Sequence, residues 1–197
     1  MQIDENILLT WGAVAKRYAK NEIIFEEGNM PRFYFQVKEG AIKMFNSNDD
    51  SREFTQGVFT DGQSFGEPPL FIDEVYPATA EALTDSTIFK LSKDTFFKIL
   101  SEYPSIHRAF TTLFAQRIYN KANLLRDIIN HTPEERITSF LEACKKKSAH
   151  FDEKIQITFT RQEIANFTGL RVETVIRTLK KMEEEDKVTI DHRKLYY

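Results

Sequence analysis

The first half of the chain alternates short hydrophobic runs with turn-forming residues. Between about residues 21 and 91, the runs EIIFEEG, FYFQVKEGAIKMFN, EFTQGVF and TIFKL are each short enough to be strands or hairpins. Turn-forming pairs such as Gly28-Asn29 and Asp61-Gly62 separate these runs. Many short strands at this spacing, with no long helices between them, predict an antiparallel roll or barrel and disfavour a doubly wound parallel sheet.

The hydrophobic period changes after Pro104. Hydrophobic residues recur about every 3.6 positions through residues 105–132, which contain neither proline nor glycine, and this pattern predicts one long amphipathic helix. A helix of roughly 25 residues is about 38 Å long, more than a small domain needs, so part of its hydrophobic stripe is expected to stay uncovered. We therefore favour a dimer interface over a helix that packs only on its own roll. The expected interface residues are Phe110, Leu113, Phe114, Ile118, Leu125 and Ile128.

A new helix is expected to begin at Thr132. This threonine is followed by Pro133 and, three positions on, by Glu135, which together form a helix cap, a first-turn proline and a capping-box acid. The predicted division of the chain is therefore a β-roll over 1–103, a long helix over 104–131 and a further domain over 132–197.

The strongest motif is TRQEIANFTGLRVETVIRTLKKM, which begins at Thr160. Thr160 and Glu163 form another capping box, and Gly169 lies where the short helix after them must stop. A second helix follows, and its hydrophobic period assigns Val175, Leu179 and Met182 to a buried face. Two short helices joined by a glycine-containing turn predict a helix-turn-helix. The runs IQITF before it and KVTIDHRKLYY after it predict short strands, which would make a winged helix-turn-helix.

Charged side chains on the predicted second helix suit contacts with phosphates and base edges. Its exposed face carries Arg171, Glu173, Arg177, Lys180 and Lys181. A solvated charged face on a helical hairpin is the alternative interpretation. Because the capping, the turn and the exposed basic residues agree, we favour DNA binding. The expected DNA-contacting residues are Thr160, Arg161, Gln162, Arg171, Val172, Glu173, Arg177 and Lys180.

Composition narrows the class of protein only slightly. The net charge is −3, and residues 133–197 carry 13 Lys and Arg against 12 Asp and Glu, which permits nucleic-acid binding without indicating it. There is no signal-peptide pattern and no run long enough to span a membrane. The single cysteine, Cys144, excludes an internal disulfide and a multi-cysteine metal site, so a reducing cytoplasm is the expected location.

With these motifs in place, residues 15–197 resemble the Crp/Fnr family of bacterial transcription regulators. The most specific segments are the helix-turn-helix and the cassette FGEPPLF…YPATAEA. The resemblance implies an α+β fold: an antiparallel, jelly-roll-like β-roll as a cyclic-nucleotide-binding-type sensor domain, a long dimerisation helix and a C-terminal winged helix-turn-helix. It also implies double-stranded DNA, a second copy of the chain and RNA polymerase as partners, with no membrane.

The cassette is where the resemblance implies an effector pocket. The corresponding residues are Phe65, Gly66, Glu67, Pro77, Ala78 and Thr79. In members that bind cyclic AMP, a glutamate contacts the ribose and an arginine neutralises the phosphate, but here the arginine position is Pro77 and no Lys or Arg lies between Arg52 and Lys90. Losing that arginine removes a charge-assisted bond. This departure from the family's pattern predicts no cofactor, and weak or no binding of cyclic AMP. A different, less anionic effector and no effector at all both stay open. Glu67 is expected to cap backbone amides.

The resemblance also implies a DNA sequence. Glu173 and Arg177 match the family's glutamate and arginine, which suit the cytosine amino group and the guanine acceptors of one G·C pair. Val172 matches the oxygen-sensing branch, whose half-sites are TTGA-like, whereas Ile176 stands where that branch carries serine. The expected operator is an inverted repeat resembling TTGA…TCAA.

Two other classes of protein are alternatives to a DNA-binding regulator. A metal-dependent cupin enzyme needs histidines on its strands, and residues 1–106 contain none; there is also no G-x-S-x-G or GxxxxGK motif. We therefore expect the protein not to be an enzyme. A cyclic-nucleotide-binding regulatory module that acts through protein contacts would explain the roll and the long helix, but not the capped helix-turn-helix.

Overall fold

The computed structural model describes residues 2–47, 53–130, 132–146, 154–192 and 194–197, with the backbone only for 123–130. The chain forms two compact units, residues 1–119 and 120–197, and each is described by itself. Helix α4 (Pro104–Asn130) begins in the first unit and ends in the second. The predicted long helix is thereby confirmed.

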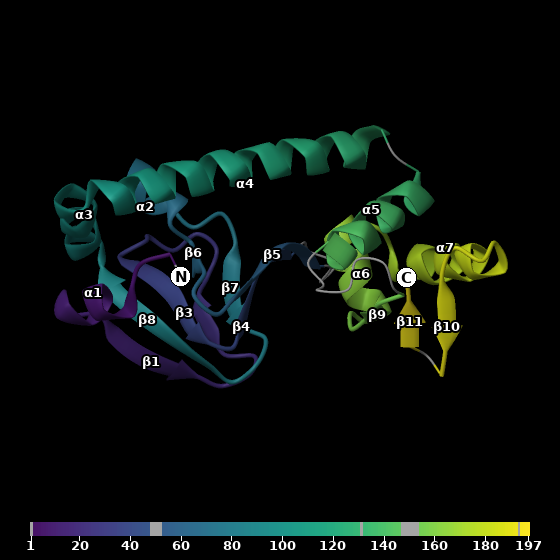
Figure 1. Ribbon diagram of the computed structural model, residues 1–197, viewed down its shortest axis with the longest axis horizontal. Coiled ribbons are helices and arrows are strands. Elements are labelled where there is room, and N and C mark those ends of the chain that lie inside the picture. The colour runs from purple at the N-terminus through teal and green to yellow at the C-terminus, as the bar shows by residue number, and fades with distance from the viewer. Residues whose placement is uncertain (1, 48–52, 131, 147–153, 193) are drawn as a thin grey trace. The chain divides into compact units, whose positions relative to one another are not determined.

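The first unit is built on two antiparallel four-stranded sheets (Figure 1). One sheet has the order β1-β8-β3-β6 and the other β2-β7-β4-β5. The strands are β1 (Val14–Tyr18), β2 (Ile23–Phe25), β3 (Phe33–Glu39), β4 (Ala41–Ser47), β5 (Glu53–Thr60), β6 (Ser64–Phe65), β7 (Thr79–Ala82) and β8 (Ser86–Ser92). This arrangement confirms the predicted antiparallel β-roll.

Strand β3 shows how the sequence fills the roll on both of its faces. Because neighbouring side chains on a strand point to opposite faces, Tyr34 and Phe35 enter different hydrophobic cores. Phe35 lies inside the roll beside Phe25 and Phe65, with ring centroids 5.7 and 5.6 Å away. Tyr34 stacks on Phe96 of a covering helix at 4.5 Å. Tyr34 and Phe35 are each at most 4% exposed, so β3 contributes side chains to both cores.

Four helices accompany the roll within the first unit. They are α1 (Glu5–Thr10), α2 (Pro68–Ile72), α3 (Lys93–Glu102) and the first part of α4. The sequence analysis did not anticipate α3 as a separate helix. Its side-chain cap is Ser92, which accepts a hydrogen bond from the Thr95 amide. It ends at Glu102 because Tyr103 precedes a proline and is therefore disfavoured in helical conformation. Pro104 then starts α4.

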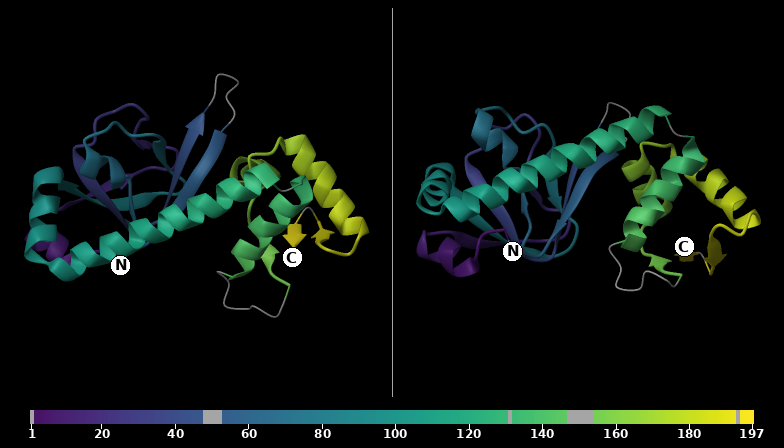
Figure 2. Two further views of the ribbon diagram at one scale, coloured as in Figure 1. Left: turned by 90° about the horizontal axis from the view of Figure 1, so that it is seen from above. Right: turned by 45° about the horizontal axis from the view of Figure 1, so that its top comes forward.

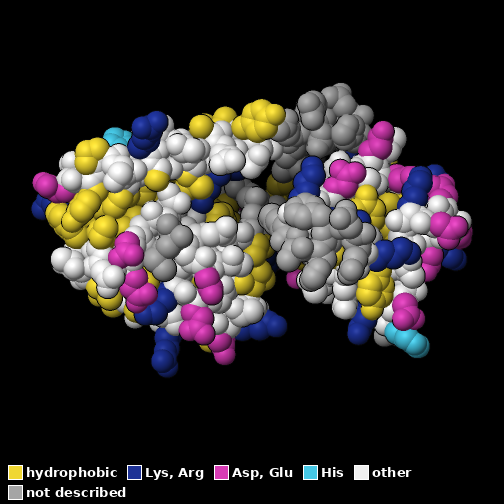
Figure 3. All heavy atoms as spheres, viewed as in Figure 1, with side chains coloured by type: hydrophobic (Ala, Val, Ile, Leu, Met, Phe, Trp, Pro, Cys, Tyr) yellow, Lys and Arg dark blue, Asp and Glu magenta, His cyan; other side chains and the backbone are white. Residues whose placement is uncertain are grey.

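The hydrophobic stripe of α4 is divided between the roll and solvent. Phe110 is 0% exposed and packs edge-on against Phe96 and Tyr34, so it is enclosed by its own chain. This corrects the expectation that Phe110 faces a second copy. Leu113 and Phe114 are half-buried against the same core. Ile118 and Tyr119 are each 69% exposed, and Figure 3 shows exposed hydrophobic side chains along α4. The side chains of Leu125 and Ile128 lie outside the described residues.

Besides the end of α4, the described part of the second unit contains three helices and a small antiparallel sheet, which pack together in every view (Figure 2). The elements are α5 (Pro133–Lys146), α6 (Arg161–Thr168), α7 (Val172–Glu184), β9 (Gln156–Ile157), β10 (Thr189–Asp191) and β11 (Lys194–Tyr196). Thr132 caps α5 as predicted: its Oγ1 accepts from the Glu135 amide, and its own amide donates to the Glu135 carboxylate at 2.7 Å. The winged helix-turn-helix expected from the sequence is thus present.

Candidate nucleic-acid interface and ligand pocket

Helix α6, the first helix of the helix-turn-helix, is fixed at both of its ends. The Thr160 amide donates to Glu163 Oε2 at 2.6 Å, and the Glu163 amide donates to Thr160 Oγ1 at 3.1 Å, so the predicted capping box forms. Gly169 ends α6 with φ 64°, the left-handed conformation that glycine adopts most easily. Arg136 of α5 donates to the Thr168 carbonyl at this end of α6. The geometry between the two helices is therefore held by local bonds and by α5.

One face of α7 anchors the helix to the core of the second unit. Val175, Leu179 and Met182 are each 0% exposed, as the hydrophobic period predicted. Val172 is half-buried against the same core. With these residues enclosed, the rotation of α7 about its axis is set, and the opposite face must point to solvent.

The exposed face of α7 carries several charged side chains that have no partner within the described part of the chain. Glu173, Arg177 and Lys180 are exposed, and no hydrogen bond or ion pair joins any of their side chains to another part of the described chain. Lys181 behaves differently: its Nζ lies 3.0 Å from Glu134 and 3.4 Å from Glu185. Lys181 is exposed, as expected, and is not among the expected DNA-contacting residues; its pairing with acidic side chains distinguishes it from the other three.

The remaining expected DNA-contacting residues differ in how far burial and hydrogen bonds within the protein already occupy their side chains. The Thr160 hydroxyl is used in the capping box, and the Gln162 amide donates to Asn166 at 2.9 Å. Arg161 is half-buried, and burial lowers the pKa of its guanidinium. Arg171 precedes α7 and is exposed. The expected residues thus lie on the first turn of α6 and along the first three turns of α7, and Glu173, Arg177 and Lys180 of α7 have no partner among the described residues.

The interior of the roll beside the cassette is filled by aromatic rings. Tyr76 stacks on Phe25 with centroids 3.7 Å apart and planes 11° apart, and Phe25 stacks in turn on Phe65. Gly66 has φ +71°, and a Cβ at this position would lie only 2.8 Å from the Phe25 ring. Rings and backbone here are packed as tightly as a protein core.

Glu67 is fully buried and is satisfied by the protein itself. It accepts hydrogen bonds from the Ser64 hydroxyl and from Arg117 Nη1, the latter at 2.8 Å. Arg117 Nη2 also donates to the Ser64 carbonyl at 2.7 Å, and the guanidinium lies over the Phe59 ring. Glu67 makes no capping bond to α2, so the expectation that it caps backbone amides is corrected.

Arg117 is the residue that sequence reasoning missed at this site. The cassette itself contains no cation. The guanidinium that pairs with Glu67 comes from α4, fifty residues along the chain. A signal was present: Arg117 lies four positions after Leu113 and one before Ile118, within the hydrophobic stripe. A charged residue on the hydrophobic side of an amphipathic helix often has a buried partner.

The other residues of the expected pocket also contribute to packing. Ala78 is 0% exposed. The Pro77 carbonyl accepts from Asn46 Nδ2 at 2.6 Å, and Thr79 Oγ1 accepts from the Glu27 amide at 3.1 Å. Burial, followed by the charge of Glu67, raises the pKa of Tyr76. The segment 76–79 is thus tied to neighbouring strands and loops.

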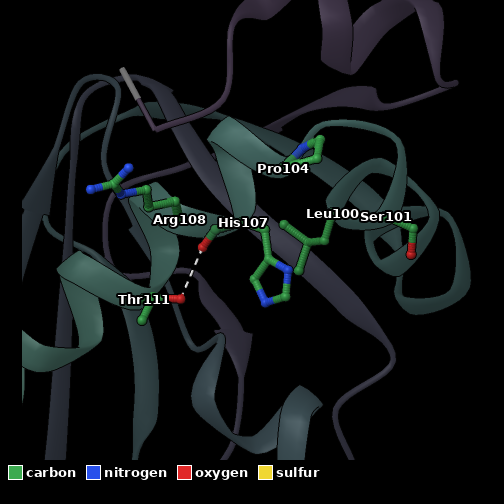
Figure 4. A pocket seen from close by; sticks show the side chains of 6 residues that line it. All are labelled: Leu100, Ser101, Pro104, His107, Arg108 and Thr111. Atoms are coloured by element: carbon green, nitrogen blue, oxygen red, sulfur yellow. Dashed lines mark hydrogen bonds between the residues drawn. The ribbon is translucent and has the colours of Figure 1, made fainter.

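A depression of about 380 Å³ lies elsewhere, where α3 meets α4 (Figure 4). It is lined by Leu100, Ser101, Pro104, His107, Arg108 and Thr111. Thr111 donates to the His107 carbonyl within α4. Among the described residues, no group of His, Cys, Asp and Glu could hold a metal ion, and no helix is long and hydrophobic enough to cross a membrane.

A β-roll followed by a winged helix-turn-helix with an uncompensated charged face defines a DNA-binding transcription regulator. Comparison with known families agrees with this class. Residues 15–103 match the cyclic nucleotide-binding domain, and residues 135–196 match the Crp-like helix-turn-helix domain. The chain belongs to the Crp/Fnr family of transcription regulators.

Individual relatives are distant but cover most of the chain. The chain is 23% identical to the transcriptional activator protein anr of Pseudomonas aeruginosa over 180 residues, 90% of this chain and 73% of that protein. It is 25% identical to the nitrogen fixation regulation protein FixK of Azorhizobium caulinodans, over 88% of this chain and 70% of that protein. The c-di-GMP responsive regulator CLP of Xanthomonas campestris has the same fold: the TM-score is 0.83 at 19% identity, over 97% of this chain and 98% of that one.

Proposed function

We propose that the protein acts as a homodimer that binds a TTGA-like inverted repeat without requiring cyclic AMP. The observation that carries the proposal is the charged face of α7, where Glu173, Arg177 and Lys180 are exposed without partners among the described residues. Charged groups left unpaired on a rotationally fixed helix are available to bases and phosphates. RNA polymerase as a further partner and the cytoplasm as location belong to the same proposal.

Sequence recognition rests on Glu173 and Arg177. They are four residues apart, so they share one side of α7. A guanidinium suits the paired O6 and N7 acceptors of guanine, and a carboxylate suits the N4 donor of cytosine. Both therefore fit a single G·C pair. Lys180, one turn further along, and Arg171, at the start of the helix, are suited to phosphates.

Dimerisation is supported by Ile118 and Tyr119, two large hydrophobic side chains that the roll leaves 69% exposed on α4. A hydrophobic stripe on a long helix is a common basis for a two-fold helix pair. With Phe110 enclosed by its own chain, the proposed interface comprises Ile118, Tyr119 and the later part of α4.

Independence from cyclic AMP is supported by the interior of the roll. No Lys or Arg from residues 53–89 is available for a cyclic phosphate. Glu67, which would face a ribose, is already bonded to Arg117 and Ser64. Phe25 and Tyr76 fill the space beside Gly66.

Selection from random double-stranded DNA tests the proposal. The expected product is an inverted repeat that contains the G·C pair, with half-site centres about one helical turn apart. Affinity for it should fall steeply between 50 and 200 mM salt because several phosphate contacts release counterions, on the order of tenfold or more. A product without two-fold symmetry, or affinity that ignores salt, would contradict the proposal and favour a module that acts through protein contacts.

A further inference from the structure

Ile176 is a hydrophobic residue that the core of its unit does not use. Its side chain is 52% exposed, in the middle of α7. Among the described residues of 120–197, it alone combines a large hydrophobic side chain with high exposure. The other hydrophobic residues of α7 either are fully buried or, like Val172, pack against the core.

The position of Ile176 on the helix places it within the proposed DNA-contacting face. At 3.6 residues per turn it is offset by ~60° from Glu173 and by ~40° from Lys180, and Arg177 follows it directly. Lys180, Glu173 and Arg177 all lie on one side of Ile176, and Val172 lies on its other side. Ile176 is thus an exposed residue at the border of the charged face, next to side chains that have no partners in the described structure. It is close enough to Glu173 and Lys180 to approach the same stretch of DNA.

The chemistry of the groove determines what Ile176 can contact. An isoleucine side chain neither donates nor accepts hydrogen bonds, so it cannot recognise the polar edge of a base. The major groove presents a prominent hydrophobic group, the C5-methyl of thymine. A β-branched side chain has one strongly preferred rotamer in a helix, so little side-chain entropy is lost when it is fixed against that methyl.

We infer that Ile176 is a specificity-determining residue that packs on the methyl group of a thymine next to the G·C pair. The inference rests on the proposed function and adds to it. Val172, the other hydrophobic residue among those that could face the DNA, is partly covered by the core of the unit. Ile176 therefore offers the groove a freer hydrophobic surface. The consequence is a half-site in which one thymine is chosen for its methyl group.

The test replaces each thymine of the selected half-site, one at a time, with deoxyuridine, which lacks only the methyl. Affinity is measured with wild type, Ile176→Ala and Ile176→Val, and with Ile72→Ala as a control for an exposed isoleucine in the roll. At one thymine beside the G·C pair, deoxyuridine should weaken wild-type binding roughly fourfold, as expected for one buried methyl group. Ile176→Ala should bind thymine DNA roughly tenfold more weakly and no longer distinguish the two bases, with Ile176→Val intermediate and Ile72→Ala unchanged.

The outcomes separate this inference from the proposed function. If wild type selects an inverted repeat and Arg177→Ala loses it, the proposed function holds. If wild type and Ile176→Ala then show the same deoxyuridine effect at every thymine, or if no thymine is selected beside the G·C pair, the inference is wrong. If wild type selects no sequence at all, both are wrong. A urea titration of Ile176→Ala should show unfolding no easier than wild type, because an exposed isoleucine contributes little to the core and alanine favours helix.

Discussion

At the scale of single residues, Arg117 and Glu67 form the least expected contact in the protein. The buried Glu67 carboxylate and the Arg117 guanidinium neutralise each other. The Ser64 hydroxyl also donates to Glu67, and the Ser64 carbonyl accepts a hydrogen bond from Arg117. An ion pair of this kind contributes little net stability compared with hydrophobic residues, but removing one partner leaves a buried charge without compensation. The pair also joins α4 to the roll at the cassette.

Arg117→Met should therefore reduce the free energy of unfolding by about 3 kcal/mol. Adding Glu67→Gln to Arg117→Met should restore a large part of the loss, because the charge left behind is then gone. Arg108→Met, an exposed position on the same helix, is the matched control and should change stability by less than about 0.5 kcal/mol. Urea unfolding followed by circular dichroism measures all three variants. Equal stabilities for Arg117→Met and Arg108→Met would contradict the ion-pair argument.

Arg177 and Lys181 offer a second residue-scale comparison, four positions apart on α7. Arg177→Ala should cost roughly 1–3 kcal/mol in binding at the cognate guanine and flatten the preference for that base pair. Lys181→Ala should retain that preference, because Lys181 is held by Glu134 and Glu185. Titration of both variants against the selected operator and a G·C-to-A·T operator measures the difference. A Lys181→Ala variant that loses base preference as Arg177→Ala does would overturn this division of the helix face.

At the scale of elements, local signals predicted the long helix α4, the start of α5, the helix-turn-helix and the longer strands between residues 21 and 91. The capping boxes at Thr132 and Thr160 and the glycine at 169 specify helix ends within a few residues, so they are visible in the sequence. Helices α2 and α3 and strand β6 were not foreseen: β6 has two residues, and α2 begins with the adjacent prolines Pro68 and Pro69. Proline is compatible with the first turn of a helix, and a two-residue strand is defined by its partner rather than by its own pattern.

The chemistry of the cassette could be predicted only in part from the sequence, because part of it depends on contacts with a distant helix. The absence of a cation between residues 53 and 89 is written in the sequence. The arrival of Arg117 from α4, and the enclosure of Phe110, depend on which face of α4 meets the roll. That choice is made by tertiary packing, which a hydrophobic period of one helix does not specify.

The cap of α6 gives a prediction at this scale. Thr160→Ala removes the oxygen that accepts from the Glu163 amide, so the second unit should lose about 1 kcal/mol of stability. Thr160→Ser keeps the acceptor and serves as the control, with a loss under about 0.5 kcal/mol. Thermal unfolding followed at the helical signal distinguishes the two variants. If alanine and serine behave alike, the capping box does not stabilise α6.

At the scale of the whole molecule, the interior of the roll is filled with side chains beside the cassette, where the family resemblance implies an effector pocket. Isothermal calorimetry with cyclic AMP should show no binding tighter than millimolar, because residues 53–89 contain no Lys or Arg, Arg117 is already paired with Glu67, and aromatic rings fill the interior. The same calorimetric run with the selected operator present checks whether DNA changes the result. Micromolar affinity under either condition would contradict the argument from Glu67 and Arg117.

Assembly is the last prediction at this scale, and it links α4 to the form of the operator. Light scattering should give about twice the 23.0 kDa of one chain, because Ile118 and Tyr119 on α4 remain uncovered by the roll. Ile118→Glu should shift the mass toward one chain, since a carboxylate buried in the interface has no partner. Ile72→Glu, which changes an equally exposed isoleucine on α2, should leave the dimer intact.

The same variants connect assembly with recognition. If the helix pair positions two copies of α7 on successive half-sites, Ile118→Glu should bind an isolated half-site as wild type does but lose most of its advantage on the full repeat. Ile72→Glu should keep that advantage. A mass of about 23 kDa for wild type, or an advantage on the full repeat that survives Ile118→Glu, would show that the exposed stripe of α4 is not what brings two DNA-binding units together.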